Sequence, residues 1–243
     1  MCGRFLLTSP AEAIRRRFGV EAAGLDLRPR YNIAPGQDIL VVHAADGGRR
    51  AAPMRWGLMP AWLSEPPGRP LINARIETVA ERPAFRAAFR RRRCLVPADG
   101  WYEWQPQAKG PKQPFAFIPR AARDRPFAFA GIYEEPHAAR WGEELPATVA
   151  ILTMPAWPVF AAIHDRMPVP LAPEGFAAWL DPGAPPPPPL LPQLPLLPAE
   201  AFAVRPVSRL VNRVEIDSPA ILETAETPAA RGRPPGTQGD LFG

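Results

Sequence analysis

The sequence predicts an α+β fold: one domain of mostly antiparallel β-sheet with short helices at its periphery. The chain has 243 residues, of which 47% are hydrophobic and 22% charged, so it is long enough and apolar enough to bury a core. Its 36 prolines exclude long uninterrupted helices. The apolar residues fall into short β-branched and aromatic runs between turn signals, and this pattern is typical of strands.

The first expected element is a short helix over Ala11–Phe18. Ser9 suits the N-cap, Pro10 suits the first helical position, and Gly19 can end the helix. The segment that follows this helix turns β-like, so we expect the helix to lie at the edge of the sheets.

A hairpin and a second helix are expected next. The β-branched run Asp38–His43 can pair with Ala51–Trp56 across the turn Asp46–Gly48. Two phenylalanines spaced four residues apart predict a helix over Thr78–Arg90. Five further short strands are then expected at Cys94–Pro97, Trp101–Trp104, Phe115–Ile118, Phe127–Tyr133 and Thr148–Thr153.

The C-terminal part combines a helix, a proline-rich insertion, a strand and a tail. We expect a third helix over Glu174–Leu180 and a late strand over Ala203–Val207. The run Pro185–Pro189 supports neither helix nor central strand, so it marks an insertion over about residues 182–198. The composition after about Thr227 predicts a disordered tail, which leaves one domain over residues 1–226 and a tail over 227–243.

Composition also bears on compartment and partners. No apolar run is long enough for a membrane span or a secretory signal, so we expect a cytoplasmic monomer without membrane contact. Two cysteines and three histidines are too few for a disulfide framework or a zinc site, and we expect no metal and no cofactor. The net charge of +5 comes almost wholly from arginine. It reflects either recognition of phosphate or carboxylate groups, or a nucleotide-composition bias of the source.

The second residue offers unusual chemistry. Removal of Met1 would give Cys2 both a free α-amine, with a pKa of about 7.7–8.0, and a thiol, with a pKa of about 8.5. Such a 1,2-aminothiol reacts with an aldehyde through an imine, which the sulfur closes to a five-membered thiazolidine. The alternative is a cysteine that merely stands second in the chain. Cys94, which lies between arginines and an apolar run, is interpreted as a buried structural thiol.

Six blocks of polar residues in apolar, turn-rich surroundings resemble, in order and spacing, the SOS-response-associated peptidase (SRAP) family. The resemblance extends from Cys2 to about Glu223. It implies a single SRAP-like domain with its sheets in a barrel-like arrangement, and a protein that senses abasic sites in single-stranded DNA and cross-links to them through its N-terminal cysteine. The blocks are RYNIAP (30–35), RWGLMPAW (55–62), LINARIE (71–77), PADGWYEW (97–104), IHDRMP (163–168) and VSRLVN (207–212).

The resemblance implies four catalytic residues. Cys2 would attack the C1′ aldehyde of the ring-opened abasic sugar. Glu103, whose aromatic neighbours would raise its pKa, would accept the ammonium proton of Cys2. His164 would protonate the furanose oxygen as the sugar opens, and Asn73 would orient the cysteine or the sugar hydroxyls.

The same resemblance, with the chemistry of the side chains, implies DNA contacts. Three arginines beside the catalytic residues would bind phosphates or serve as structural ion-pair partners, and an aromatic cluster would stack on bases or pack in the core. Asp99 and Asp165 would support nearby arginines or His164. The arginines are Arg4, Arg75 and Arg166, and the cluster is Trp56, Met59, Pro60 and Trp62.

Two alternative functions remain open at this point. One is a cysteine-dependent peptidase, with removal of its own Met1 as its narrowest activity, and the other is a non-catalytic module that binds single-stranded or modified DNA. The tail adds a possible partner. Gln238, Leu241 and Phe242 resemble the short peptide by which bacterial repair proteins bind the replicative sliding clamp.

Overall fold

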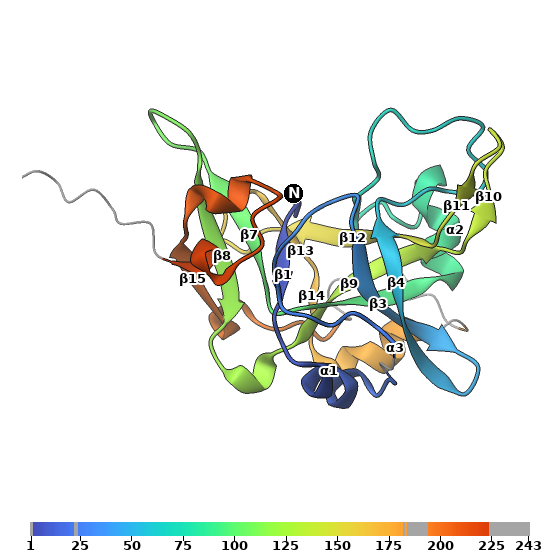
Figure 1. Ribbon diagram of the computed structural model, residues 1–243, viewed down its shortest axis with the longest axis horizontal. Coiled ribbons are helices and arrows are strands. Elements are labelled where there is room, and N and C mark those ends of the chain that lie inside the picture. Colours follow the sequence, from blue (N-terminus) through green and yellow to red (C-terminus); the bar gives the residue numbers. More distant parts are fainter. Residues whose placement is uncertain (1, 22–23, 182, 184–193, 224–243) are drawn as a thin grey trace, which may run out of the picture.

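Two β-sheets form the body of the molecule (Figure 1). The computed structural model describes residues 2–21, 24–181, 183 and 194–223. The predicted tail over 227–243 and most of the proline-rich insertion lie outside these residues. No helix among the described residues is long and apolar enough to cross a membrane.

The smaller sheet is antiparallel throughout and has the strand order β15-β8-β7-β1-β2. Its central strand β7 pairs with β1 through Phe5 opposite Trp101 and Leu6 opposite Gly100. This pairing joins the start of the chain to its middle. The strands are β1 (Phe5–Leu7), β2 (Arg30–Ile33), β7 (Gly100–Gln105), β8 (Gln113–Pro119) and β15 (Phe202–Pro206).

The larger sheet closes on itself. Its order is β13-β12-β4-β3-β6-β9-β14, with β5 on β12, and β12 pairs both with β9 and, in parallel, with β4. Five strands therefore form a ring of pairings, which agrees with the expected barrel-like arrangement. The strands are β3 (Asp38–Ala45), β4 (Gly48–Trp56), β5 (Asn73–Arg75), β6 (Arg93–Ala98), β9 (Phe127–Glu134), β12 (Thr148–Pro155), β13 (Arg166–Pro168) and β14 (Pro170–Leu171), and β10 (His137–Ala138) pairs separately with β11 (Glu144–Leu145).

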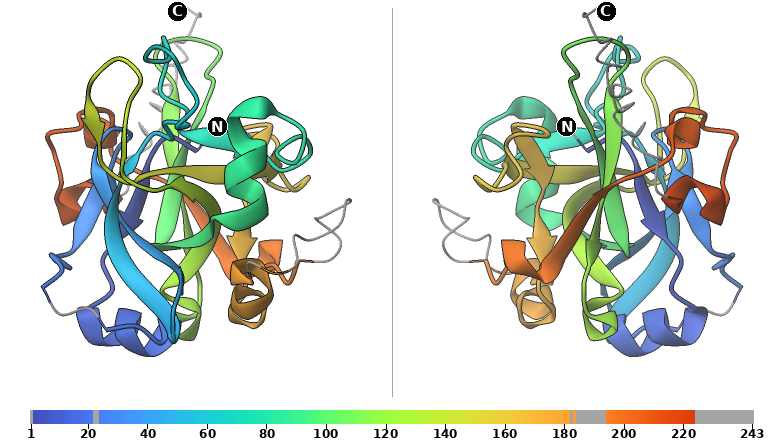
Figure 2. Two further views of the ribbon diagram at one scale, coloured as in Figure 1. Left: turned by 90° about the vertical axis from the view of Figure 1, so that its right-hand side faces the viewer. Right: turned by 90° about the vertical axis from the view of Figure 1, so that its left-hand side faces the viewer.

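Short helices lie around the sheets (Figure 2). They are α1 (Ala11–Phe18), α2 (Pro83–Arg91) and α3 (Phe176–Leu180), with 3₁₀ turns at Ala122–Asp124, Pro173–Gly175, Ala199–Ala201, Arg209–Asn212 and Pro219–Leu222. The predicted fold class is confirmed: mostly antiparallel sheet with peripheral helices in a single domain.

Two helix starts differ from the predictions. The second helix begins at Pro83 rather than Thr78, because proline favours the first helical position and the preceding residues form turns. The third begins at Phe176, after a 3₁₀ turn that holds Glu174.

Ser9 does not cap α1. The Ser9 hydroxyl donates instead to Asp99 Oδ1 at 2.6 Å, and Asp99 Oδ2 accepts from the backbone N–H of Thr8 at 2.6 Å and of Ser9 at 2.5 Å. Asp99 is fully buried, so these bonds compensate the loss of its hydration. The predicted role of Asp99 beside an arginine or His164 is wrong, since it fixes the turn that leads into α1.

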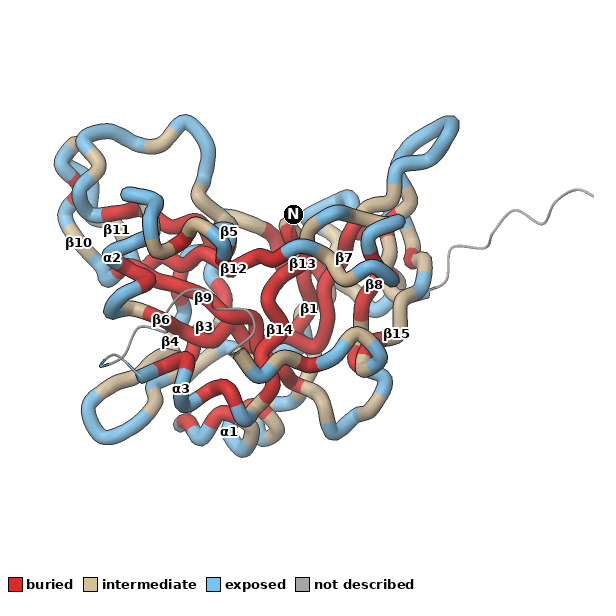
Figure 3. Tube along the Cα trace, turned by 180° about the vertical axis from the view of Figure 1, so that it is seen from behind, coloured by how far each residue is buried: buried red, intermediate tan, exposed pale blue. Residues whose placement is uncertain are grey.

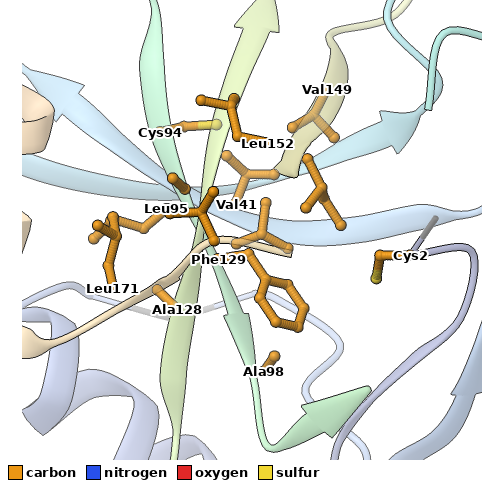
Figure 4. Packing of buried hydrophobic residues seen from close by; sticks show 14 of the residues in the cluster. Cys2, Val41, Cys94, Leu95, Ala98, Ala128, Phe129, Val149, Leu152 and Leu171 are labelled. Carbon is orange, nitrogen blue, oxygen red and sulfur yellow. The ribbon is translucent and has the colours of Figure 1, made fainter. Parts of the chain in front are cut away.

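The core reaches from the closed sheet to the start of the chain (Figures 3 and 4). Phe5 of β1 makes edge contacts with Trp56 and Phe129, with ring centroids 5.3 and 5.8 Å apart, and thereby ties the two sheets together. Cys2 and Cys94 both belong to this core (Figure 4) and both are fully buried. For Cys94 this confirms the predicted buried structural thiol.

Candidate active site between the two sheets

Strand pairing brings Cys2 to Glu103. The Tyr102 N–H donates to the Arg4 carbonyl at 3.0 Å, which continues the β1–β7 register beyond Phe5. Because these strands are antiparallel, the residues before Arg4 run alongside those after Tyr102. Cys2 is 0% exposed and Glu103 is 2% exposed, so the two side chains share a site from which water is largely excluded.

The larger sheet supplies Asn73 and His164 through β12. Strand β5 pairs in parallel with β12 and begins at Asn73, whereas β13 pairs with the end of β12 and follows His164. In Figure 3 the labels of β5, β13 and β7 surround the start of the chain. Asn73 Nδ2 donates to the Cys2 carbonyl at 2.8 Å, while Asn73 Oδ1 is buried without a hydrogen-bond partner among the described residues. Asn73 therefore fixes the Cys2 backbone through its Nδ2, and its Oδ1 can still accept a hydrogen bond from a substrate.

His164 faces Glu103. Its Nε2 lies 4.0 Å from Glu103 Oε2, and its Nδ1 lies 3.0 Å from the Arg166 backbone nitrogen. Asp165 Oδ1 is also 2.9 Å from Nδ1, but a neutral Nδ1 that accepts the Arg166 N–H cannot donate to this carboxylate as well. Asp165 is largely exposed, so we assign the backbone bond to the neutral ring and the Asp165 contact to the protonated one. The proton of neutral His164 then lies on Nε2, toward Glu103.

Burial sets the electrostatics of the site. It raises the pKa of Glu103 to about 7 and lowers the pKa of His164 below its ordinary value. Burial also raises the pKa of the Cys2 thiol, and the neighbouring Glu103 carboxylate raises it further. Near neutral pH the site therefore combines a neutral thiol, a largely neutral imidazole and a carboxyl group poised between its two protonation states.

The raised pKa of Glu103 predicts a pH-dependent cost to stability. A carboxyl group whose pKa is about 7 when folded and 4.5 when exposed stabilises the fold only while it is protonated, so stability is lost as pH rises from about 4.5 through 7. Glu103→Gln should raise the free energy of unfolding at pH 8 by about 1–3 kcal/mol, with little change at pH 4. Urea unfolding at both pH values tests this, and a variant less stable than the wild type at pH 8 would contradict it.

The arginines expected to bind phosphates lie in different surroundings. Arg4 Nη1 donates to Asn32 Oδ1 at 2.7 Å and to the Val211 carbonyl at 2.5 Å, and its guanidinium lies over the Trp104 ring at 5.9 Å. These contacts favour the structural alternative for Arg4. Arg75 is exposed at the β5 edge, next to the site, and suits a phosphate contact.

Arg166 also has structural partners. It forms a bidentate pair with Glu77, with N–O distances of 2.6 and 3.0 Å, and donates to the Thr153 carbonyl at 2.8 Å. Burial alone would raise the pKa of Glu77, but the hydrogen bonds and charge of Arg166 outweigh it, and this pKa lies below its ordinary value. These bonds hold the β13 strand that leads out of His164.

These surroundings predict different consequences for two substitutions. Arg166→Ala should lower the free energy of unfolding by about 1–3 kcal/mol, because Glu77 and Thr153 lose their partner. Arg75→Ala should leave stability unchanged and reduce the log–log salt slope of binding to undamaged single strands by about 0.7. Thermal unfolding and fluorescence anisotropy measure the two effects. An Arg166→Ala variant of normal stability with a reduced slope would restore its interpretation as a phosphate contact.

The aromatic cluster divides between core and surface. Trp56 is 0% exposed and donates from Nε1 to the Ile72 carbonyl at 2.9 Å, so its prediction as a base-stacking residue is wrong; Pro60 is buried as well. Met59 is half-buried, and its N–H donates to Thr148 Oγ1 at 3.0 Å. Trp62 is 48% exposed in the loop between β4 and β5, which rises on the same side as the start of the chain (Figures 1 and 2). Trp62 alone of the four offers an exposed ring to a base.

Sequence reasoning missed the role of Asn32, which binds the side chain of Arg4. Asn32 is buried, accepts from Arg4, and donates from Nδ2 to the carbonyls of Arg213 and Ile216. Asp217 Oδ1 accepts from the Asn32 N–H at 2.9 Å. These bonds fasten the segment after Asn212 over β2. Asn32 lies inside the block RYNIAP (30–35). A polar asparagine in a short strand-like segment was the signal in the sequence that could have found it.

The described residues contain no group of three or more histidine, cysteine or acidic side chains that could hold a metal ion. The described site brings together the Cys2 thiol, the Glu103 carboxyl, the His164 imidazole and the Asn73 amide. Together they suit a nucleophilic addition with proton transfer.

Comparisons with known proteins identify the family of this chain. The family model described as SOS response associated peptidase (SRAP) matches residues 1–214. "Abasic site processing protein YoqW" of Bacillus subtilis is 36% identical over 227 residues, which cover 92% of this chain and 100% of that protein. "Abasic site processing protein YedK" of Escherichia coli is 36% identical over 188 residues, 74% of this chain and 79% of that protein. An X-ray structure from Bacteroides thetaiotaomicron, 23% identical, has a TM-score of 0.76 over 92% of this chain and 100% of its own, a likeness of fold. The chain therefore belongs to the SOS response associated peptidase (SRAP) family.

Proposed function

We propose that this protein recognises abasic sites in single-stranded DNA and captures them as a covalent thiazolidine cross-link through Cys2, after removal of Met1. The convergence of Cys2 with Glu103, His164 and Asn73, from strands of both sheets, carries the proposal. The names of its relatives, abasic site processing proteins, support the substrate class.

The first chemical step forms an imine. The Glu103 carboxylate, which is partly populated near pH 7 because the pKa of this group is about 7, accepts a proton from the Cys2 ammonium group. His164 Nε2 lies 4.0 Å from Glu103 Oε2. A protonated His164 can donate from Nε2 to the furanose oxygen as the sugar opens, and its ring takes back the proton that the C1′ hydroxyl loses as it becomes the aldehyde. The free amine then adds to the C1′ aldehyde, and loss of one water molecule leaves a carbon–nitrogen double bond.

The second step closes the ring. Glu103 passes the proton that it took from the ammonium group to the imine nitrogen, the Cys2 sulfur bonds to the resulting iminium carbon, and the thiol proton then passes to the Glu103 carboxylate. A neutral, buried thiol suits this step, because its proton leaves only as the carbon–sulfur bond forms. The product differs from protein and aldehyde by the loss of a single water molecule.

The same electrostatics speak against a thiolate-dependent peptidase. Such enzymes lower the pKa of their cysteine with a histidine cation or a helix N-terminus. Here burial and a carboxylate raise the pKa of the Cys2 thiol. A module that only binds DNA, in turn, has no need of a buried carboxyl group with a pKa of about 7.

Incubation with single-stranded DNA that contains one abasic site tests the proposal, with a denaturing gel as the readout. We expect a slower band that forms without reductant and does not form with undamaged DNA. A protein that binds the abasic strand and forms no stable product would leave only the binding function.

The proposal predicts that an N-terminal extension blocks capture. A protein that retains Met1 or an uncleaved tag has an amide in place of the Cys2 amine, so the imine cannot form. This protein should bind abasic DNA and give less than about 1% of the wild-type product, since the nucleophile itself is lost. Cleavage of the tag directly before Cys2 is the matched control and should restore the product. Efficient cross-linking by the uncleaved protein would contradict the role of the amine.

We further propose that Gln238, Leu241 and Phe242 bind the sliding clamp; these residues lie outside the described part of the chain. The apolar burial of Leu241 and Phe242 would supply the affinity. Deletion of residues 237–243 should then leave capture of a short abasic oligonucleotide unchanged and abolish binding to the clamp.

A further inference from the structure

Arginines line two neighbouring hollows at the end of the molecule opposite the start of the chain. Figures 1 and 3 place α1 at the bottom of the molecule and the N-terminus in its upper half. The larger hollow, of about 810 Å³, lies between α1 and the turn that joins β3 to β4. The smaller, of about 320 Å³, lies between α1, Arg125 and Pro173. Arg16 lines both hollows, so they adjoin along one face.

We call this surface the α1 face. It is strongly positive, because six arginines line the two hollows against three carboxylates. One carboxylate, Glu12, pairs with Arg15 at 2.9 Å. The arginines are Arg15, Arg16, Arg17, Arg49, Arg50 and Arg125, and the carboxylates are Glu12, Glu21 and Asp46.

Half of these arginines lack a partner for the guanidinium group. Among the described residues, the side chains of Arg16, Arg50 and Arg125 form no hydrogen bond or ion pair. Arg125 Nε is moreover buried, and a buried donor without an acceptor costs free energy. An anionic oxygen in the smaller hollow would supply the missing acceptor.

Two other arginines are held in place by single bonds. Arg49 Nη1 donates to the Phe18 carbonyl at the end of α1 at 3.1 Å, and Arg17 Nη2 donates to the Arg123 carbonyl. A guanidinium group has five N–H donors, so each keeps most of its donors for a ligand. Anchored arginines of this kind lose little conformational freedom when they bind an anion.

The form of the face points to a polymer of phosphates. A free anion needs one hollow, whereas here two arginine-lined hollows share Arg16 and together extend the positive charge over a larger surface. Neither lining contains an aromatic residue, so the face offers no platform for base stacking. Contacts with the sugar–phosphate backbone alone match these properties.

We propose that the α1 face is a second DNA-binding surface, which binds the backbone of a strand whose abasic site lies at Cys2. The inference rests on the proposed DNA partner. The α1 face would contact the DNA backbone independently of base sequence and away from the active site at Cys2. Only strands long enough to extend from Cys2 to the α1 face would make this contact.

The experiment compares strand lengths with the triple variant Arg16→Ala, Arg50→Ala, Arg125→Ala. Anisotropy with an undamaged strand of about 30 nucleotides should show binding about 10- to 100-fold weaker at low salt, and a log–log salt slope smaller by about 2. Binding of a strand of about 6 nucleotides, which fits a single site, should be unchanged. The control variant Arg86→Ala, Arg90→Ala removes exposed arginines from α2 and should have a much smaller effect on the long strand.

Three outcomes would overturn the inference: unchanged binding of the long strand by the triple variant, equal weakening of both strand lengths, or equal weakening by the α2 control. Competition by inorganic phosphate alone, without an effect of strand length, would reduce the α1 face to a site for small anions. Capture of a short abasic strand by the wild type, measured in parallel, separates failure of this inference from failure of the proposed function.

Discussion

Cys2→Ala is expected to abolish the denaturant-stable product with abasic DNA, a loss of at least about 10³-fold. Cys2, which lies next to Glu103, supplies the thiol that closes the ring, and alanine has no thiol. Cys2→Ser keeps the amine and loses the sulfur, so it should form only an imine that borohydride can trap. Because the Cys2 side chain is fully buried, both variants require a check of folding by circular dichroism.

Two comparisons make this expectation decisive. Cys94→Ala removes the other buried cysteine and should leave capture unchanged, since Cys94 lies within β6, where it pairs with His43 and Gly131 of the larger sheet. Both Cys2 variants should still bind the abasic strand. A stable, unreduced product with Cys2→Ala would refute the thiazolidine mechanism.

Glu103→Gln is expected to slow the covalent step about 10²–10⁴-fold, the range that a positioned acid–base group contributes. In the wild type the rate should rise with pH through about 7, because the carboxylate accepts protons only after it has lost its own. The variant should lose this rise. Single-turnover rates with saturating abasic DNA between pH 5.5 and 8.5 measure both effects.

Glu134→Gln is the matched control. Glu134 is also a buried glutamate, but it lies at the end of β9 and its carboxylate is 2.8 Å from the Arg92 guanidinium. It should not alter the rate of capture. If Glu103→Gln bound DNA poorly and cross-linked its bound fraction at the wild-type rate, Glu103 would be a structural residue. Together with the expected gain in stability at pH 8, slow capture would show that the protein maintains a costly buried carboxyl group for its chemistry.

The fold class was predictable because strand signals are local. β-Branched and aromatic runs such as Phe127–Tyr133 mark strands wherever they pair, and Gly19 ends α1 as expected. The pairing of β1 with β7 was not predictable, since partners nearly 100 residues apart leave no periodic trace in either segment. The close approach of Cys2 and Glu103 depends on that pairing, and therefore on the whole fold.

Among the site residues, too, some features were predictable from the sequence and others only from the structure. The polar blocks of the sequence contain Asn73, Glu103 and His164, and the structure brings these residues to Cys2. Sequence alone could not separate the two alternatives for Trp56 or Arg166, because a tryptophan suits a core as well as a base, and an arginine suits a carboxylate as well as a phosphate. Burial of Trp56 excludes base stacking by its ring, and the pairing of Arg166 with Glu77 favours a structural role for this arginine.

Intact mass spectrometry of the product with an abasic single strand, followed by peptide mapping, tests the central claim most directly. The account predicts a mass equal to the protein without Met1 plus the DNA less one water molecule, attached at Cys2, and unchanged by borohydride because a closed thiazolidine has no double bond to reduce. An adduct at another residue, or one that gains two hydrogens from borohydride, would contradict covalent capture by the amine and sulfur of Cys2.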